Sequence, residues 1–262
     1  MDQKPRIIVV LPAYNAAETL EKTYADIAKE LVSGIILVDD VSQDQTVEVA
    51  RALGLSVVIH VQNKGYGGNQ KTCYLEALKA GADIVVMLHP DHQYDSRLIP
   101  ELIQPIAGGR ADIVIGSRIL TGKALEGGMP WWKLLSNRLL TSLENIAYKK
   151  QLTDGHSGFR AYSPRFLTTV PFLLNSDDFV FDSQIVARAV RFGFQIEEIP
   201  VQARYFPEAS SVNFRVSTIY GIKTLGVVQA FFSHKAGIGH FRYLEKNLVE
   251  VVSRHHHIQI FR

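Results

Sequence analysis

The sequence predicts an α/β fold built on a mostly parallel sheet with helices on both faces. Short runs that are apolar throughout recur along the first half of the chain, and segments with helical spacing separate them. Strands that are apolar on both sides are typical of parallel sheets covered by helices. Ligands of such sheets bind beyond the carboxyl ends of the strands, so the residues that follow each strand are the candidates for function.

The first half alternates strand and helix in a regular order. The runs RIIVVLPA, GIILVDD, SVVIHV, DIVVML and DIVIGS predict strands at 6–13, 34–40, 56–61, 83–88 and 112–117. The spacing of apolar residues predicts helices at 16–32, 44–53, 69–80 and 96–107. Asp44 is placed to cap the second of these helices.

The second half is less regular. It predicts helices at 129–150, 178–193 and 217–233 and a strand at 196–203. The first of these helices carries apolar residues near one face, namely Trp131, Leu135, Leu139, Leu143 and Ile146. We expect a loop at 154–163 that leads into a strand or turn. A main region at 1–212 and an amphipathic helical tail at 213–262 follow from this pattern.

The composition excludes several classes of protein. A net charge of +2 over 262 residues gives no basis for nucleic-acid binding. No run of about 18 uncharged apolar residues occurs, so we expect no membrane-spanning helix. The single cysteine, Cys73, fits a reducing compartment, and the first residues lack the pattern of a signal peptide. We therefore expect a cytoplasmic protein.

Two polar segments at strand ends are candidates for nucleotide binding. Asp39 and Asp40 end the second strand, and adjacent carboxylates there can accept hydrogen bonds from a ribose or a base, or help to hold a cation. The segment NKGYGGNQK (63–71) can bring backbone N–H groups close to phosphates. Its spacing is neither a P-loop nor a dinucleotide fingerprint, and a tight turn is the alternative interpretation.

The segment HPDHQYD predicts a metal site. His89, Asp91 and Gln93 alternate, so an extended chain places all three on one side. Carboxylate and amide oxygens with an imidazole nitrogen suit Mn²⁺ better than Mg²⁺. The alternative is that His89 only packs or forms a hydrogen bond while Asp91 acts alone.

Arginine is the residue best suited to bidentate phosphate contacts. Arg118 follows the fifth strand directly and is the strongest candidate. The further candidates are Arg138, Arg160 and Arg204.

The order of these segments resembles a known family. LPAYNAAETL, VDDVSQDQT, NKGYGGNQ, HPDHQYD, GSR and DGHSGFRAYS follow one another as in family 2 glycosyltransferases with the GT-A fold. The resemblance covers residues 6–204 and is strongest to polyprenyl-phosphate sugar transferases of the dolichol-phosphate mannosyltransferase type. It implies an inverting transfer of sugar from a UDP- or GDP-sugar to a polyprenyl phosphate, with Mg²⁺ or Mn²⁺ as cofactor.

The resemblance also implies roles for individual residues. Asp91 and Gln93 are the implied metal ligands, with His89 beside them, and Asp91 and Arg118 are the implied catalytic residues. The implied nucleotide-binding residues are Pro12, Ala13, Tyr14, Asn15, Asp39, Asp40, Asn63 and Gly65. The residues implied to hold the phosphates or the acceptor are Arg118, Arg138, Ser157, Arg160 and Arg204.

The chain departs from the family pattern at three places. His89 replaces the first acid of the D-x-D motif, Asp182 replaces a glutamate, and RYFPEASSVNF lacks the family's lysine. These differences bear on the metal and the acceptor more than on the fold. A nucleotide-sugar-binding protein with little or no turnover is one alternative function, and transfer to a soluble hydroxyl is another. A hydroxyl acceptor would need a base, for which Asp178 and Asp182 are candidates.

A lipid-phosphate acceptor implies contact with a membrane surface. Trp131 and Trp132, together with the helix at 217–233, predict peripheral binding at the cytoplasmic face. The alternative is that both tryptophans pack in the core.

Overall fold

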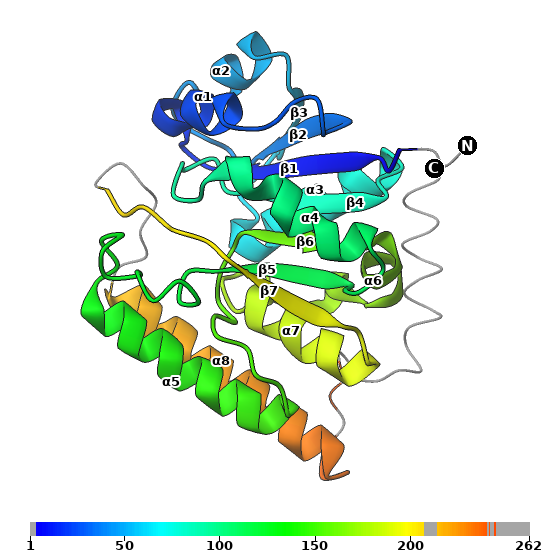
Figure 1. Ribbon diagram of the computed structural model, residues 1–262, viewed down its shortest axis with the longest axis vertical. Coiled ribbons are helices and arrows are strands. Elements are labelled where there is room, and N and C mark those ends of the chain that lie inside the picture. The colour runs from blue at the N-terminus through cyan, green and yellow to red at the C-terminus, as the bar shows by residue number, and fades with distance from the viewer. Residues whose placement is uncertain (1–3, 207–213, 240, 242–243, 245–262) are drawn as a thin grey trace.

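A seven-stranded sheet forms the centre of the molecule (Figure 1). The computed structural model describes residues 4–206, 214–239, 241 and 244. The sheet order is β3-β2-β1-β4-β6-β5-β7. The strands are β1 Ile7–Ala13, β2 Gly34–Asp39, β3 Ser56–Ile59, β4 Ile84–Met87, β5 Ile113–Ser117, β6 Arg160–Tyr162 and β7 Ile196–Pro200.

The predicted parallel arrangement is confirmed for six of these strands. β6 is the exception, because it lies between β4 and β5 and runs antiparallel to both. It comes from the segment at 154–163, for which the sequence predicted only a strand or a turn. Its three residues are fully buried, so the short strand closes the middle of the sheet.

Helices cover both faces of the sheet, as predicted. On one face, α1 (Ala17–Ala25), α2 (Thr46–Ala52) and α4 (Ile99–Ala107) pack on Leu11, Leu37 and Val86. On the other face, α3 (Gly65–Lys79), α6 (Pro164–Thr169) and α7 (Phe181–Phe192) pack on Val10 and Val85. These alternating strand residues are buried because each side of the pleat faces a helix layer.

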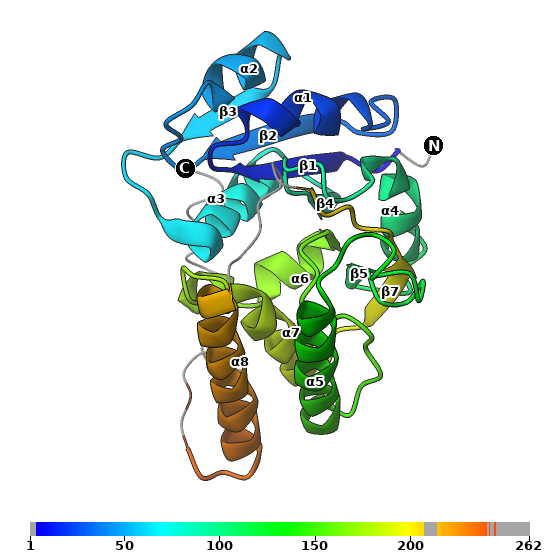
Figure 2. The same ribbon diagram turned by 90° about the vertical axis from the view of Figure 1, so that its left-hand side faces the viewer.

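Two long helices, α5 (Trp131–Tyr148) and α8 (Phe214–Lys235), contact each other and project together from one end of the molecule (Figure 2). α8 adds Val227, Val228 and Phe231 to the core beside α7, so its inner side belongs to the main body. No described helix is both long enough and apolar enough to cross a membrane. The predicted boundary at residue 212 and the C-terminal RHHHIQIFR lie outside the described residues, as does most of RYFPEASSVNF.

Several element boundaries differ from the prediction. α1 ends at Ala25 because the chain turns at Asp26, so the predicted helix at 16–32 is too long. α3 begins at Gly65, four residues before the predicted start. The first turn of the helix predicted at 96–107 is a 3-10 turn, Ser96–Leu98, and a second one, Phe172–Leu174, was not predicted. α6 was also not predicted, although Ser163 caps it and Pro164 begins it, a recognisable start signal.

α5 buries polar residues and exposes apolar ones, which is the opposite of an ordinary surface helix. Its buried residues are mostly polar and include Asn137, Thr141 and Glu144. Its apolar residues face outward, with Trp131 70% exposed, Leu135 61%, Leu139 60% and Ile146 69%. The apolar face predicted from the sequence therefore exists, but it does not pack against the core. Neither tryptophan packs there, since Trp132 is only half-buried.

Candidate active site

A cavity of about 710 Å³ lies at the carboxyl ends of β1, β2 and β4 and extends to α5 and α8. This is the edge at which parallel sheets bind their ligands, and the volume is within the usual range for small-molecule sites. Residues that follow different strands meet there, among them Asn15, Asp40, His89 and Arg118. The side toward α5 adds aromatic and basic side chains, including Trp132 and Lys133.

Most of the predicted nucleotide-binding residues line this cavity, namely Pro12, Ala13, Tyr14, Asn15, Asp40, Asn63 and Gly65. Tyr14 is 56% exposed, so its ring is free to contact a ligand. Asn15 adopts a positive φ of 51°, and its Oδ1 accepts a hydrogen bond of 2.7 Å from the N–H of Gln43. This contact ties the end of β1 to the loop after β2.

Asp39 does not line the cavity but lies directly behind its wall. It is 1% exposed, and its Oδ2 accepts a hydrogen bond of 3.0 Å from the N–H of Ser42. Its Oδ1 is buried and has no hydrogen-bond partner among the described residues. A buried oxygen without a partner costs free energy, so Oδ1 is a position at which a ligand N–H or O–H would be stabilising.

Asp40 is already engaged within the protein. Its two oxygens accept hydrogen bonds from the N–H groups of Lys64 and Gly65, at 2.8 and 2.9 Å, and cap the start of α3. Nδ1 of His60 lies 2.7 Å from Oδ1. The structure therefore gives Asp40 a role in capping a helix. Asp40 also lines the cavity, and its direct contact with a ligand stays a prediction.

The glycine-rich segment also has a structural role. The N–H groups of Gly67 and Gly68 both donate to the carbonyl of Asp177, at 2.7 and 3.3 Å. A Cβ added to Gly67 would lie 2.4 Å from the carbonyl oxygen of Ser176, so only glycine fits there. These N–H groups are not free to hold phosphates, and the alternative interpretation of this segment as a tight-packing turn is the better one.

The segment after β4 brings His89, Asp91 and Gln93 to the cavity. Oδ1 of Asp91 accepts a hydrogen bond of 3.1 Å from the N–H of Gln93. Burial raises the pKa of Asp91, and the nearby His89 acts in the opposite direction. A buried carboxylate gains from a bound cation, and carboxylate, amide and imidazole groups are all donors that divalent ions accept. Among the described residues, no group of three or more His, Cys, Asp or Glu side chains is placed to hold a metal ion, so Asp91 would depend on Gln93 and on a bound ligand to complete a site.

His89 belongs to a row of aromatic and acidic side chains. Its Nε2 lies 3.2 Å from the hydroxyl of Tyr66, and the two rings stack with centroids 5.4 Å apart. The hydroxyl of Tyr66 donates to Oδ2 of Asp182 at 2.7 Å. Asp182 also lies near Arg160, with 3.7 Å between Oδ1 and Nη1. Sequence reasoning missed Tyr66, because it lies inside a glycine-rich segment that pointed to backbone contacts.

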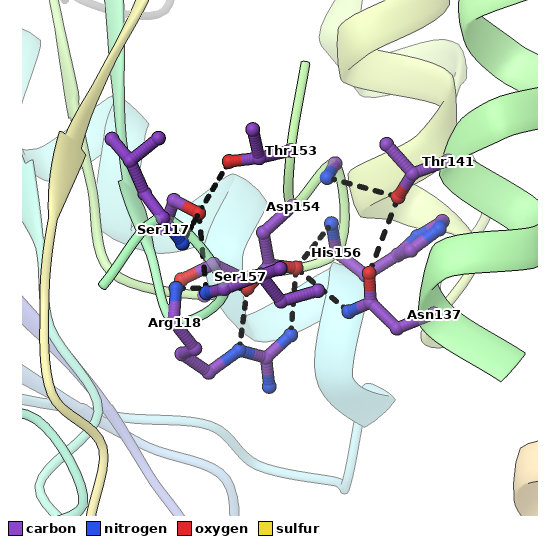
Figure 3. A network of polar contacts seen from close by, with 12 residues as sticks. Ser117, Arg118, Asn137, Thr141, Thr153, Asp154, His156 and Ser157 are labelled. Atoms are coloured by element: carbon purple, nitrogen blue, oxygen red, sulfur yellow. Dashed lines mark hydrogen bonds and ion pairs between the residues drawn. The ribbon is translucent and has the colours of Figure 1, made fainter. Parts of the chain in front are cut away.

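Arg118 forms a buried ion pair with Asp154 (Figure 3). Its Nε and Nη2 donate to the two carboxylate oxygens at 2.7 and 2.9 Å, and Nη1 donates to the hydroxyl of Tyr205 at 3.3 Å. Burial alone would raise the pKa of Asp154, but Arg118 holds it well below its usual value. The guanidinium group of Arg118, which was predicted to bind a diphosphate, is therefore paired with Asp154 through Nε and Nη2. Nη1 is the nitrogen that remains on the side toward a ligand.

The other predicted arginines lie outside the cavity. Arg160 is fully buried and donates to the backbone carbonyls of Ser157 and Gly155, so it fixes the loop before β6. Ser157 is itself buried beside Tyr94. Arg204 is paired with His92 and Asp95 at the surface.

Arg138 is exposed on α5, and the basic residue of this helix that lines the cavity is Lys133. Burial, together with the neighbouring Arg118, lowers the pKa of Lys133. The helical spacing could have indicated Lys133, which lies one turn before Asn137 on the inner face.

Neither predicted base is free. Asp178 accepts hydrogen bonds from Lys223, Ser176 and the N–H of Val180, does not line the cavity, and has a lowered pKa. Burial alone would raise that pKa, and these donors outweigh it. Asp182 does line the cavity, so it is the candidate that the geometry favours for a hydroxyl acceptor.

A second buried pair lies on the side toward α8, where His156 lines the cavity and Glu144 lies outside the lining. Oε2 of Glu144 is 3.4 Å from Nε2 of His156, and Nδ1 of His156 is 2.6 Å from the hydroxyl of Tyr220. Burial raises the pKa of Glu144 to about 8 and lowers the pKa of His156 to about 4. At neutral pH the pair is therefore a carboxylic acid next to a neutral imidazole.

This pair makes stability depend on pH. Between pH 6.5 and 8 the folded protein keeps the proton on Glu144, whereas the unfolded chain has released it near pH 4.5, so the free energy of unfolding falls as pH rises. Glu144→Gln removes this slope, which amounts to at most about 1.4 kcal/mol per pH unit. Urea unfolding at pH 6.5, 7.2 and 8 measures it. His156 is neutral in the folded state over this window but partly protonated in the unfolded chain near pH 6.5, and it is present in both proteins, so its contribution cancels in the comparison. Parallel slopes for the two proteins would contradict the assignment.

The fold and the cavity together define an α/β enzyme that binds its ligands at the ends of parallel strands. The sequence profile described as glycosyl transferase family 2 matches residues 8–170, more than half of the chain. The chain belongs to this family, and it is therefore a transferase.

Named relatives agree with the family. The chain is 28% identical over 216 residues to UDP-N-acetylglucosamine–dolichyl-phosphate N-acetylglucosaminyltransferase of Methanococcus voltae, covering 76% of this chain and 86% of the relative. It is 27% identical over 208 residues to undecaprenyl-phosphate mannosyltransferase of Micrococcus luteus, covering 75% and 82%. The resemblance predicted from the sequence to polyprenyl-phosphate sugar transferases is confirmed.

A solved structure confirms the predicted GT-A fold. Glucosyl-3-phosphoglycerate synthase from Mycobacterium tuberculosis, crystallised with Mn²⁺, UDP and glucosyl-3-phosphoglycerate, superposes with a TM-score of 0.68. The sequence identity is 21%, and the match covers 87% of this chain and 80% of that one. At this identity the likeness concerns the fold alone.

Proposed function

We propose that this protein transfers a sugar, with inversion, from a UDP- or GDP-sugar to a polyprenyl phosphate at a membrane surface. The main support for the proposal is that one cavity brings together residues suited to a nucleotide, to a metal ion and to an acceptor phosphate. Tyr14 and Asn15 form a side for the nucleotide, Asp91 lies between, and Lys133 lies on the side toward α5. The names of the two relatives, which specify dolichyl and undecaprenyl phosphate, support the lipid acceptor.

Asp91 would hold a divalent ion with Gln93 and His89, and Mn²⁺ fits this donor set better than Mg²⁺. When bound, such an ion neutralises charge on a departing diphosphate. The side chains do the remaining work. Tyr14 and Asn15, which line the cavity, orient the nucleoside, and the ionised phosphate of the acceptor needs no strong base.

Lys133 is the residue that we assign to the acceptor phosphate. Lys133→Met is expected to raise the KM for polyprenyl phosphate about tenfold to a hundredfold, because a charged hydrogen bond is lost. Arg138→Met is the matched control, since Arg138 is exposed on the same helix and does not line the cavity. Steady-state kinetics with varied acceptor measure both. An equal effect of the two substitutions would exclude the assignment.

The exposed apolar side of α5 and α8 supports binding to a lipid surface. Trp131, Leu135 and Leu139 are exposed on α5, Ile222 is 65% exposed on α8, and the two helices contact each other. Large apolar side chains are unfavourable in water and favourable at the boundary of headgroups and acyl chains. α8 would rest in this interface as part of the predicted tail, at the cytoplasmic face.

Flotation with anionic liposomes tests the membrane contact. We expect the protein to float at low salt and to bind less as salt rises, because the basic residues contribute a screened attraction. Replacing Trp131, Leu135 and Leu139 with serine should weaken binding at least tenfold. Val61→Ser is the control, since Val61 is 98% exposed in the loop after β3. A wild-type protein that stays unbound at low salt would favour a soluble acceptor.

A screen of UDP- and GDP-sugars by thermal shift with Mn²⁺, followed by transfer assays with polyprenyl phosphate, tests the function itself. Turnover onto the lipid phosphate supports the proposal. Donor binding without turnover would instead identify a nucleotide-sugar-binding protein. Transfer only to a soluble hydroxyl compound would point to Asp182 as a base and contradict the lipid acceptor.

A further inference from the structure

We propose that Tyr66 and Asp182 are positioning residues that fix His89 with its proton on Nε2, so that Nδ1 is the nitrogen offered to the divalent ion. This inference rests on the proposed function for the presence of the ion. It concerns side chains that the family pattern does not supply, because His89 stands in place of an acid and Asp182 in place of a glutamate.

The hydrogen bonds determine the tautomer. The single O–H of Tyr66 donates to Oδ2 of Asp182 at 2.7 Å, and a carboxylate can only accept. The oxygen of Tyr66 is then an acceptor toward its other neighbour, Nε2 of His89 at 3.2 Å. Nε2 must therefore carry the hydrogen, and the lone pair of the ring is on Nδ1.

Asp182 is itself held in place from its other side. Nε2 of Gln70 donates to its Oδ1 at 3.4 Å, and the buried guanidinium of Arg160 lies 3.7 Å from the same oxygen. Both neighbours are donors, so they keep Asp182 as the acceptor in its contact with Tyr66.

The Nε2 edge of the ring is closely packed. A Cβ added to Gly158 would lie 2.7 Å from Nε2 of His89 and 2.8 Å from Cδ2, so the backbone there approaches this edge closely. The ring of Tyr66 stacks on His89, and the ring of Phe179 packs on Tyr66 with centroids 4.6 Å apart. Nε2 is thus engaged by Tyr66, whereas Nδ1 forms no hydrogen bond with any described residue.

The arrangement has a chemical consequence for the ion. A histidine ligand whose second nitrogen donates to a carboxylate, here through a tyrosine, is oriented and is a stronger donor. The imidazole would then compensate for the missing first acid of the motif. Loss of such a supporting contact costs about 10- to 100-fold in metal affinity.

The tautomer can be measured without metal or substrate. Long-range ¹⁵N–¹H spectra of the histidine-labelled full chain report which nitrogen carries the proton, and His89→Gln assigns the signal among the nine histidines. We expect Nε2–H for His89 in the wild type and a mixture of tautomers in Tyr66→Phe. If His89 of the wild type carries its proton on Nδ1, the inference is overturned. This measurement on the wild type does not depend on whether any variant folds.

Binding of Mn²⁺ alone, followed by electron paramagnetic resonance, gives the second readout. We expect nitrogen coupling to the bound ion in the wild type and about 10- to 100-fold weaker binding in Tyr66→Phe. Tyr24→Phe is the control, because Tyr24 lies on α1 with its ring under Nζ of Lys29 and takes no part in the row of His89, Tyr66 and Asp182. Equal Mn²⁺ affinity in wild type and Tyr66→Phe, or bound Mn²⁺ without nitrogen coupling, overturns the inference.

These results are separable from the proposed function. Sugar transfer by a protein whose Mn²⁺ shows no nitrogen coupling would refute the role of His89 and leave the function standing. The expected tautomer and coupling in a protein that transfers no sugar would support the inference and refute the function.

Discussion

Asp91→Asn is expected to lower sugar transfer by about two to three orders of magnitude and to leave the fold intact. Asp91 is the carboxylate among the three residues that would hold the ion, and it lies at the cavity edge with a raised pKa. An amide keeps the shape and the contact with the N–H of Gln93 but removes the charge that binds a cation. Stabilisation of a leaving group by a metal amounts to several kcal/mol, which corresponds to this loss of rate.

The measurement is kcat with saturating donor and Mn²⁺, accompanied by a thermal unfolding curve. Asp83→Asn is the matched control, since Asp83 lies at the opposite end of β4 and accepts a hydrogen bond from the N–H of Arg6. It should alter stability slightly and transfer not at all. Turnover by Asp91→Asn close to that of the wild type would remove Asp91 from the catalytic residues.

Arg118→Met is expected to lower the free energy of unfolding by about 3–5 kcal/mol. The substitution leaves the carboxylate of Asp154, which has no exposed surface, without its main counter-charge. The remaining donor from a side chain, Nδ2 of Asn137 at 2.7 Å, cannot replace a guanidinium. Chemical denaturation at pH 7 measures the loss.

Two further variants test whether the loss of stability comes from breaking the buried ion pair or from removing any arginine. Arg165→Met removes an exposed arginine from Asp112 and should cost no more than about 1 kcal/mol. Arg118→Met combined with Asp154→Leu removes both charges and should recover part of the stability. If Arg118→Met and Arg165→Met cost the same, the buried pair is not a major source of stability.

The sequence predicted the layers of this fold well because the strands are apolar on both sides and few other structures bury such runs. It predicted the edge of the sheet where the cavity lies for the same reason. For β6 it left a strand and a turn as alternatives, since three residues are too short for a periodic signal and their pairing depends on strands far away in the chain. For α5 it left exposure and core packing of the tryptophans as alternatives, because a hydrophobic pattern gives a face but not what that face contacts.

Within the site, the residue types predicted where a side chain lies better than they predicted what it contacts. Asp40 and Gly65 reached the cavity edge as predicted, yet their polar groups bond to each other across the start of α3. Arg118 was placed correctly, but its partner, Asp154, comes from a loop whose position no local pattern reveals. Such pairings are set by tertiary contacts, which is why sequence reasoning assigned both groups to ligands.

The position of β6 also constrains the order in which the chain can fold. Among the described strands, β4 pairs with β1 on one edge and with β6 on the other, so β5 cannot join β4 before β6 has been synthesised. The nascent protein must expose a hydrophobic strand edge until residues 160–162 are synthesised and inserted. Non-local pairing of this kind slows folding, and an open edge is prone to aggregation. Expression as a fragment that stops before Arg160 would therefore yield an insoluble half-sheet.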